Sequence, residues 1–199
     1  VGIITIAGST YFIIYSDKLY YIASPLLSLF ERRITRNESS LGEKNYDIIL
    51  FGAHRMGSKV IDALYKKKNS LLIVDFNPEI IEKLSRKGYN VLYGDISDSS
   101  MLEDMAMSKA KIVISTIPEV EANIIIKQRL IKTKSKAVFI ATSEYARGAL
   151  ELYKNGIDLA LVPHLISGEY LAALLESNKE STKYYKDLGN TQLKELVKK

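Results

Sequence analysis

The stretch at residues 47–60, DIILFGAHRMGSKV, decides the fold, because it passes from an apolar strand through a glycine-flanked turn into a helix. Gly52 permits the tight turn at the end of the strand, and Gly57 lets the helix pack closely against that strand. The first backbone N–H groups of a helix and its positive dipole end attract anions. Arg55 adds a charged fork to the same turn. The stretch therefore predicts a strand–turn–helix unit that binds phosphate.

His54 occupies the position at which dinucleotide-binding turns of the pattern G-x-G-x-x-G carry their middle glycine. That glycine lets the backbone approach a pyrophosphate closely. A β-carbon there moves the phosphate outward, or an imidazole hydrogen bond replaces the close approach. The alternative is a turn that has lost its ligand and only connects strand to helix. The order Ser58-Lys59 argues against a Walker A loop, in which lysine precedes serine or threonine.

Five further apolar runs follow the first one. Each is continuous in hydrophobicity instead of alternating, which is typical of strands covered on both faces. Helical segments separate the runs, so the sequence predicts an α/β, doubly wound, Rossmann-like fold with a parallel six-stranded sheet. The predicted strands lie at residues 47–52, 71–76, 90–95, 111–117, 137–142 and 158–163.

Capping residues mark the helices expected between these strands. Asn77 precedes a proline, the preferred first helical residue, and is therefore a predicted N-cap. Asp98 is a second predicted N-cap. Ser143 precedes a helix that ends at Gly156. A last apolar helix is predicted at residues 167–177, after the sixth strand.

Polar residues follow the first four strands, at the edge where open α/β sheets bind their ligands. Asp75 lies 18 residues beyond Gly57, about where an acidic side chain takes the ribose hydroxyls of a nucleotide. Asp95 is expected on the adenine side, with Ser115 and Thr116 beside the middle of the ligand. The candidate ligand-binding residues are Gly52, His54, Arg55, Met56, Gly57, Asp75, Phe76, Asp95, Ile96, Ser115, Thr116 and Ile117.

The beginning of the chain is apolar and uncharged as far as Tyr15. A helix of that length covers about 22 Å of a hydrocarbon core roughly 30 Å thick. We interpret it as a transmembrane helix whose beginning is missing; the alternatives are a short buried segment and an amphipathic helix packed on the domain. Tyrosines and then arginines follow, as at a cytoplasmic membrane exit. The expected organisation is a membrane region at 1–30, a linker at 31–46, a nucleotide-binding domain at 47–178 and a charged tail at 179–199.

Composition limits the remaining function classes. With 47% hydrophobic and 26% charged residues, the 199-residue chain can bury a core. The net charge is +5, but the basic residues are dispersed along the chain, so we expect solvated helix ends and no nucleic-acid partner. The chain has no cysteine, and His54 and His164 lie far apart in the sequence, so no metal is expected.

Residues 47 to about 178 resemble the nucleotide-binding half of the RCK/KTN family, the TrkA-N-type domains that regulate K⁺ channels and transporters. The resemblance rests on FGAHRMG, VDFNPEIIEKL, YGDISDSSMLEDM, AKIVISTIPEVEANI and NGIDLALVPHLISGEYLAALL. The opening segment, STYFIIYSDKLYYIASPLLSLFERR, resembles the last transmembrane helix and exit of Kef-type cation:proton antiporters.

This resemblance implies a domain on the cytoplasmic side of the cell membrane that gates a K⁺ or Na⁺ transporter in response to NAD(H), AMP, ADP or ATP. It also implies a homodimer through the helix at 167–177 and a transmembrane transporter portion upstream. Asp75 should favour NAD(H) over NADP(H), because a carboxylate repels a 2′-phosphate. We expect a regulator and not an enzyme. Two other hypotheses stay open: a nucleotide-free dimerisation module, and an NAD-dependent oxidoreductase that uses Glu119, Glu144 or His164 at the strand ends.

Overall fold

The computed structural model describes residues 2–15, 45–96, 101–102, 105–177 and 182–197. The chain divides into two compact units, Val1–Ser40 and Leu41–Lys199. The described part of the first unit consists mainly of α1 (Gly2–Ile14). The hydroxyl groups of this helix donate to its own backbone, for example from Thr10 Oγ1 to the carbonyl oxygen of Ile6 at 2.9 Å. Such bonds satisfy polar side chains within an apolar helix.

The predicted membrane region at residues 1–30 is described only at residues 2–15. Among the residues that the structure describes, no helix is both long enough and apolar enough to cross a bilayer, and α1 has 13 residues. The predicted membrane exit at residues 16–30 and most of the predicted linker at 31–46 lie outside the described residues. The predicted helix cap at Asp98 lies outside them as well.

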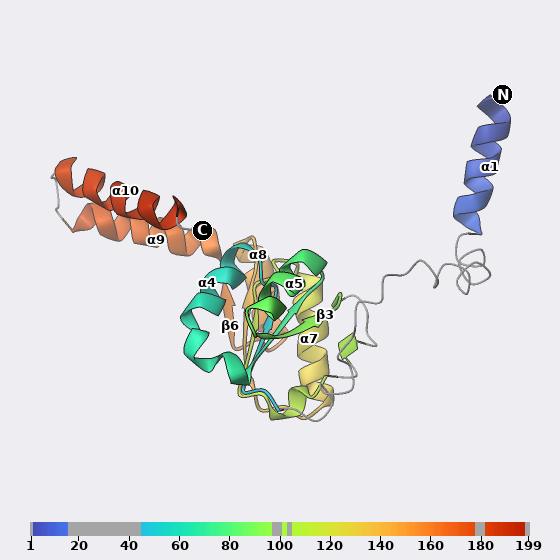
Figure 1. Ribbon diagram of the computed structural model, residues 1–199, viewed down its shortest axis with the longest axis horizontal. Helices are drawn as coiled ribbons and strands as arrows, with labels where there is room; N and C mark the ends of the chain where they lie inside the picture. Colours follow the sequence, from blue (N-terminus) through green and yellow to red (C-terminus); the bar gives the residue numbers. More distant parts are fainter. Residues whose placement is uncertain (1, 16–44, 97–100, 103–104, 178–181, 198–199) are drawn as a thin grey trace. The chain divides into compact units, whose positions relative to one another are not determined.

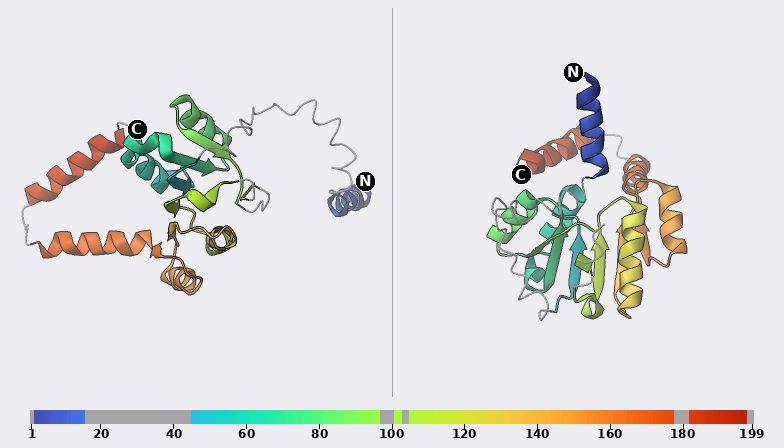
Figure 2. Two further views of the ribbon diagram at one scale, coloured as in Figure 1. Left: turned by 90° about the horizontal axis from the view of Figure 1, so that it is seen from below. Right: turned by 90° about the vertical axis from the view of Figure 1, so that its right-hand side faces the viewer.

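The second unit is built on a parallel six-stranded sheet with helices on both faces (Figures 1 and 2). The strand order is β3-β2-β1-β4-β5-β6, and every neighbouring pair is parallel. This confirms the predicted doubly wound, Rossmann-like fold, and each observed strand lies within its predicted run. The strands are β1 (Ile48–Phe51), β2 (Leu71–Asp75), β3 (Asn90–Tyr93), β4 (Ile112–Ser115), β5 (Val138–Thr142) and β6 (Leu159–Leu161).

Helices connect the strands and follow the last one. Asn77 caps one of them as predicted, because its side chain accepts a hydrogen bond from the backbone N–H of Glu79 at 2.9 Å. The α-helices of this unit whose bounds lie in the described residues are α4 (Arg55–Ala63), α5 (Pro78–Arg86), α7 (Val120–Lys132), α8 (Ala146–Lys154), α9 (Pro163–Glu176) and α10 (Thr182–Val197). Two short 3₁₀ helices are η1 (Tyr65–Ser70) and η2 (Met107–Lys109).

Two helix starts differ from the prediction, and one helix was not predicted. Ser143 is not the N-cap of α8, which begins at Ala146 after Tyr145. The Ser143 hydroxyl instead donates to the carbonyl oxygen of Tyr145 at 2.9 Å, a local bond that competes with capping. Helix α9 begins at Pro163, ahead of the predicted start at residue 167. The predicted charged tail contains α10.

The central strand β1 explains why the apolar runs are continuous. Its four residues are all buried. Ile49 and Phe51 pack into the part of the core on the side of α7, and Ile48 and Leu50 pack on the side of α4 and α5. Successive side chains of a strand point to opposite faces, so both sets must be apolar when both faces are covered.

Candidate functional site

A cleft of about 1150 Å³ opens at the carboxyl ends of the strands. It includes the carboxyl ends of the neighbouring strands β1 and β4, where the strand order reverses and where open α/β sheets bind ligands. The structure brings most of the predicted site residues together here. Those that line the cleft are Gly52, His54, Arg55, Met56, Asp75, Phe76, Asp95, Ile96, Thr116 and Ile117.

Two glycines shape the turn between β1 and α4. Gly52 has a φ of +82°, in the left-handed region that favours glycine, and a β-carbon there would lie 2.6 Å from Thr116 Oγ1. A β-carbon on Gly57 would collide with the carbonyl oxygen of Gly52. Gly57 does not line the cleft; it allows α4 to approach the turn, which is the packing role expected from the sequence.

The amino end of α4 carries two basic residues that line the cleft. His54 stands at the N-cap position with φ −77°, a conformation open to any residue, and its side chain makes no capping hydrogen bond. His54 and Arg55 are both exposed and both line the cleft. An imidazole and a guanidinium beside a helix N-terminus form a suitable surface for a phosphate.

Asp75 is nearly buried, with 6% of its surface exposed, and it binds backbone on two sides. Its Oδ2 accepts a hydrogen bond from the N–H of Ala53 at 2.7 Å, and its Oδ1 accepts one from the N–H of Asn77 at 2.8 Å. The carboxylate therefore joins the turn after β1 to the turn after β2. Each carboxylate oxygen has a second lone pair, so Asp75 keeps acceptor capacity on the cleft side.

Thr116 and Ser115 have different roles from one another. Thr116 lines the cleft, and its hydroxyl donates to the carbonyl oxygen of Gly52 at 3.0 Å, which ties the end of β4 to the glycine turn. Ser115 is fully buried and does not line the cleft. Its hydroxyl oxygen accepts a hydrogen bond from the N–H of Ile117 at 3.3 Å. Ser115 thus makes a structural contact in the core, and its predicted ligand contact stays a prediction.

The far side of the cleft carries acidic residues, two of which, Glu119 and Glu144, were named above only for the oxidoreductase hypothesis. Glu119, Glu121 and Glu144 line it, together with His164. The signal was present in the sequence, because Glu119, Glu144 and His164 come shortly after β4, β5 and β6, at the same edge of the sheet as Asp75 at the end of β2. A hydrogen bond with Glu144 and the negative charge of that carboxylate raise the pKa of the Tyr145 hydroxyl. Among the described residues, no cluster of histidine and carboxylate side chains could hold a metal ion.

Asn123 holds the two loops on this side in register. It is fully buried on α7, and its Nδ2 lies within hydrogen-bond distance of three carbonyl oxygens, those of Ile117 (2.9 Å), Glu119 (3.0 Å) and Thr142 (3.1 Å). The loop after β4 is thereby joined to the end of β5. Its Oδ1 has no hydrogen-bond partner within the part of the chain that the structure describes. Nothing in the sequence distinguishes this asparagine from a solvated helix residue.

Comparison with known sequences gives consistent matches. A profile of the TrkA-N domain matches residues 48–163, more than half of the chain. The glutathione-regulated potassium-efflux system protein KefC of Cronobacter sakazakii is 28% identical over 109 residues, which cover 51% of this chain and 18% of KefC. Potassium channel protein 1 of Methanocaldococcus jannaschii is 26% identical over 145 residues, which cover 71% of this chain and 43% of the channel protein. The chain spans less than half the length of either relative.

Solved structures share the fold at low sequence identity. The TrkA-N domain of the inner membrane protein ybaL from Escherichia coli has a TM-score of 0.61 at 19% identity, covering 67% of this chain and 98% of that one. The Kef CTD of Shewanella denitrificans in AMP-bound form has a TM-score of 0.55 at 22% identity, covering 75% and 96%. The GsuK channel bound to NAD has a TM-score of 0.54 at 19% identity, covering 81% and 29%.

Proposed function

Because the chain belongs to the TrkA-N domain family, we propose that residues 47–178 are the cytoplasmic, nucleotide-binding regulatory domain of a membrane potassium transport system. The specific candidate is a K⁺ or Na⁺/proton antiporter whose ion transport is gated by NAD(H) or an adenine nucleotide. The observation that supports this most strongly is the cleft at the β1–β4 switch point, where the glycine turn, Arg55 and Asp75 converge. The KefC and channel relatives are potassium transport proteins, in line with a regulator instead of an oxidoreductase.

In this proposal the nucleotide lies along the carboxyl edge of the sheet. Its phosphate binds at the amino end of α4, beside His54 and Arg55, and its ribose hydroxyls donate to Asp75. The adenine packs against Phe76, whose ring lines the cleft although 69% of its surface is exposed. An aromatic ring open to solvent at this position offers a stacking surface for a base. The β-carbon of His54 places the phosphate farther from the turn than a glycine would.

Isothermal titration calorimetry with AMP, NADH and NADPH tests the ligand class. The AMP of the Kef CTD structure and the NAD of the GsuK structure motivate the choice of the first two ligands. We expect AMP or NADH to bind and NADPH to bind at least about ten-fold more weakly, because its 2′-phosphate faces the Asp75 carboxylate. Equal affinity for NADH and NADPH would contradict the role of Asp75. Absence of binding by all three would favour the nucleotide-free dimerisation module.

Arg55→Gln is expected to weaken nucleotide binding by about ten-fold or more, because a hydrogen bond to a charged group contributes about 1.5–3 kcal/mol. Calorimetry measures the change. Lys59→Gln is the matched control, since it removes one positive charge from the same helix at an exposed position outside the cleft. If both variants bind as the unchanged chain does, the phosphate does not lie at the amino end of α4.

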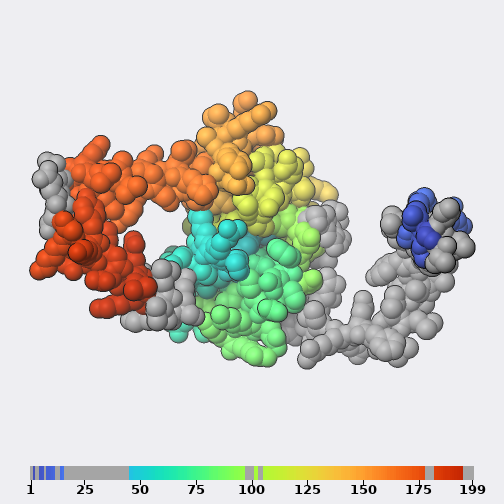
Figure 3. Space-filling model, turned by 90° about the horizontal axis from the view of Figure 1, so that it is seen from above, coloured from blue at the N-terminus to red at the C-terminus, as the bar shows by residue number. Residues whose placement is uncertain are grey.

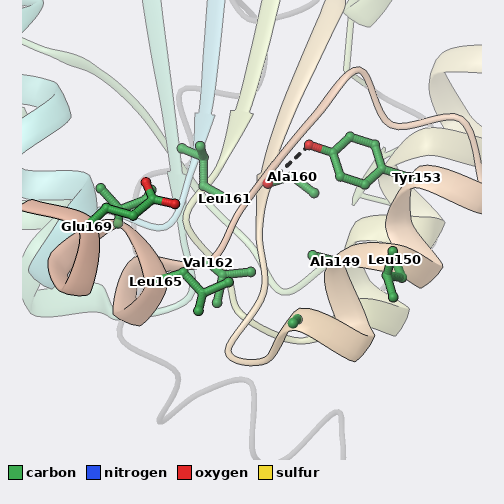
Figure 4. A pocket seen from close by; sticks show the side chains of 10 residues that line it. Ala149, Leu150, Tyr153, Ala160, Leu161, Val162, Leu165 and Glu169 are labelled. Carbon is green, nitrogen blue, oxygen red and sulfur yellow. Dashed lines mark hydrogen bonds between the residues drawn. The ribbon is translucent and has the colours of Figure 1, made fainter. Parts of the chain in front are cut away.

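We also propose that α9, which contains the predicted dimer helix at 167–177, forms a homodimer interface. In the space-filling view α9 projects from the sheet unit (Figure 3), and none of its residues is buried. Leu171 and Leu175 expose 55% and 62% of their surfaces. Beside its start is an apolar groove of about 370 Å³, lined by α8, β6 and α9 (Figure 4). Leu150 and Tyr153 lie on one side of this groove, and α9 of a second copy supplies the apolar surface that fits it.

Leu171→Glu combined with Leu174→Glu is expected to convert a dimer into a folded monomer that still binds nucleotide. Burying a leucine side chain contributes about 1.5–3 kcal/mol, and two buried carboxylates oppose association further. Analytical ultracentrifugation at tens of micromolar, on a fragment that begins near Glu43, measures the mass. Ile131→Glu, at a residue 63% exposed on α7, is the control that should remain dimeric. A monomeric unchanged fragment would remove the dimer from the proposal.

The membrane assignment of residues 1–30 is the remaining part of the proposal. It is supported by the uncharged sequence of α1 and by the hydrogen bonds that its hydroxyl groups make within the helix. We expect the full chain to require detergent, and the fragment that begins near Glu43 to be soluble and folded. A full chain that stays monodisperse in plain buffer would contradict a transmembrane helix.

A further inference from the structure

The lysines that are dispersed in the sequence gather at one edge of the sheet. All six strands are parallel, so the connections that lead into them lie together at the amino edge of the sheet (Figure 1). The cleft opens at the other, carboxyl edge. Almost every one of these connections carries lysine, and most of these side chains are exposed. The group, called the basic edge below, consists of Lys66, Lys67, Lys68, Lys87, Lys109, Lys111, Lys132, Lys134, Lys136 and Lys154.

Among the described residues of these connections, lysines outnumber acidic side chains. In the described connections that lead into the strands, the acidic residues are Asp47 and Asp158. Asp47 Oδ1 lies 2.9 Å from Lys111 Nζ, and Asp158 Oδ2 accepts a hydrogen bond from the N–H of Phe139 at 2.8 Å. Both carboxylates are therefore engaged locally. The opposite, carboxyl edge carries the acidic lining of the cleft, so charge is separated between the two edges.

Helix ends explain only some of these lysines. Helix C-termini attract cations, which accounts for Lys87, Lys132 and Lys154 at the ends of α5, α7 and α8. Lys111 and Lys136 lie beyond such ends, next to β4 and β5. Lys134 has a φ of +52°, in the left-handed region where glycine or asparagine is favoured. A lysine at that position is unfavourable for the backbone and adds charge to the edge.

The chain reaches β1 at this same edge, because Asp47 immediately precedes the first strand. The residues upstream include the apolar helix α1, which we assign to the membrane. The basic edge is therefore the part of the sheet unit from which the connection to that segment departs. We propose that the basic edge docks on the anionic lipid headgroups of the membrane surface, which leaves the nucleotide cleft at the edge directed away from the lipid.

Charge complementarity selects this partner. Clustered lysines near a bilayer are attracted to anionic lipid without any fitted geometry. Recognition of nucleic acid adds stacking aromatics or arginine forks to charge. The cations of the basic edge are lysines, and the exposed ring of Tyr65 beside them lies next to Lys68, with Nζ 5.8 Å from the ring centroid. The proposal goes beyond nucleotide regulation, because it concerns the edge opposite the cleft and makes no use of a ligand there.

Lysine acylation of the full chain in nanodiscs tests the proposal. One set of discs contains phosphatidylcholine alone, and the other contains equal parts of phosphatidylcholine and phosphatidylglycerol. Mass spectrometry after treatment with an amine-reactive ester gives the rate at each lysine. We expect Lys109, Lys134 and Lys136 to react at least about ten-fold more slowly in the anionic discs, since each lysine near the surface contributes about a five-fold preference. In about 1 M salt, where the Debye length is about 3 Å, the difference should disappear.

Matched variants identify the surface. A triple variant should weaken docking by about a hundred-fold and abolish the protection of Lys66 and Lys67 from acylation. It combines Lys109→Gln, Lys134→Gln and Lys136→Gln. Lys59→Gln, Lys183→Gln and Lys186→Gln remove the same charge from exposed positions elsewhere and should leave that protection intact. If the full chain does not insert into discs, its co-sedimentation with vesicles of the same two compositions measures the same preference.

Several results would overturn the proposal. The basic edge does not contact lipid if its lysines are acylated at the same rate in both kinds of disc. The same conclusion follows if anionic lipid protects Lys59, Lys183 and Lys186 as strongly as it protects the lysines of the basic edge. If added RNA or an acidic peptide protects the lysines of the basic edge more strongly than anionic lipid does, the edge binds that partner instead. Calorimetry with AMP and NADH is independent of this test. If the chain fails to bind nucleotide but its lysines are still protected by lipid, only the regulatory proposal is contradicted.

Discussion

Gly57→Ala is expected to lower the free energy of unfolding by about 3 kcal/mol or more and to abolish nucleotide binding. Alanine normally stabilises the interior of a helix relative to glycine by roughly 0.5–1 kcal/mol. Here the sign reverses, because the added β-carbon collides with the carbonyl oxygen of Gly52, a backbone atom that cannot move without opening the turn. Thermal unfolding followed by circular dichroism measures the stability change.

Gly189→Ala is the control for this experiment. Gly189 lies in α10, and a β-carbon there meets nothing within 4 Å, so the substitution should stabilise the helix by the usual amount. The two variants differ only in what surrounds the same added methyl group. Equal effects at both positions would show that α4 does not approach the turn as closely as described.

Asp75→Ala is expected to cost about 3–5 kcal/mol of stability as well as nucleotide affinity, because it removes two hydrogen bonds to one charged group. The backbone N–H groups of Ala53 and Asn77 lose their acceptor and remain largely enclosed. Asp75→Asn should lower the free energy of unfolding by about half as much, since the single side-chain oxygen of asparagine can accept a hydrogen bond from one of the two N–H groups. Its amide nitrogen then faces the other.

Chemical denaturation and calorimetry together separate the two effects in Asp75→Asn. Asp62→Asn makes the same change of charge at an exposed position on α4, outside the cleft, and should leave both quantities within about 0.5 kcal/mol. A variant at Asp75 that lost affinity at unchanged stability would show that the carboxylate serves the ribose without joining the two turns.

The strands were predictable because burial on both faces of a sheet requires a continuous run of apolar residues. A residue such as Phe51 must be apolar wherever helices cover both sides of its strand, so the run can be recognised without knowing its neighbours. The Asn77 cap was predictable for a similar reason, since the bond to Glu79 is local. The fold therefore followed from short-range signals repeated along the chain.

The sequence predicted where the site lies on the sheet, but it did not predict the hydrogen-bond partners of the site residues. Strand order places Asp75, Thr116 and Ser115 at the ligand edge, yet the direction of each side chain depends on atoms far away in the chain. Thr116 bonds the turn at Gly52, and Ser115 turns into the core. The gathering of lysines at the amino edge was missed for the same reason, because their proximity comes from the sheet and not from their spacing.

The central place of β1 has a consequence for synthesis on the ribosome. Ile48 pairs with Leu71 of β2 on one side and with Ile112 of β4 on the other. A nascent chain can complete the β1–β3 half while the other edge of β1 remains open until β4 has emerged. An apolar strand with unpaired N–H and C=O groups is a template for aggregation. The growing polypeptide thus exposes the edge of a fully buried strand until β4 has left the ribosome.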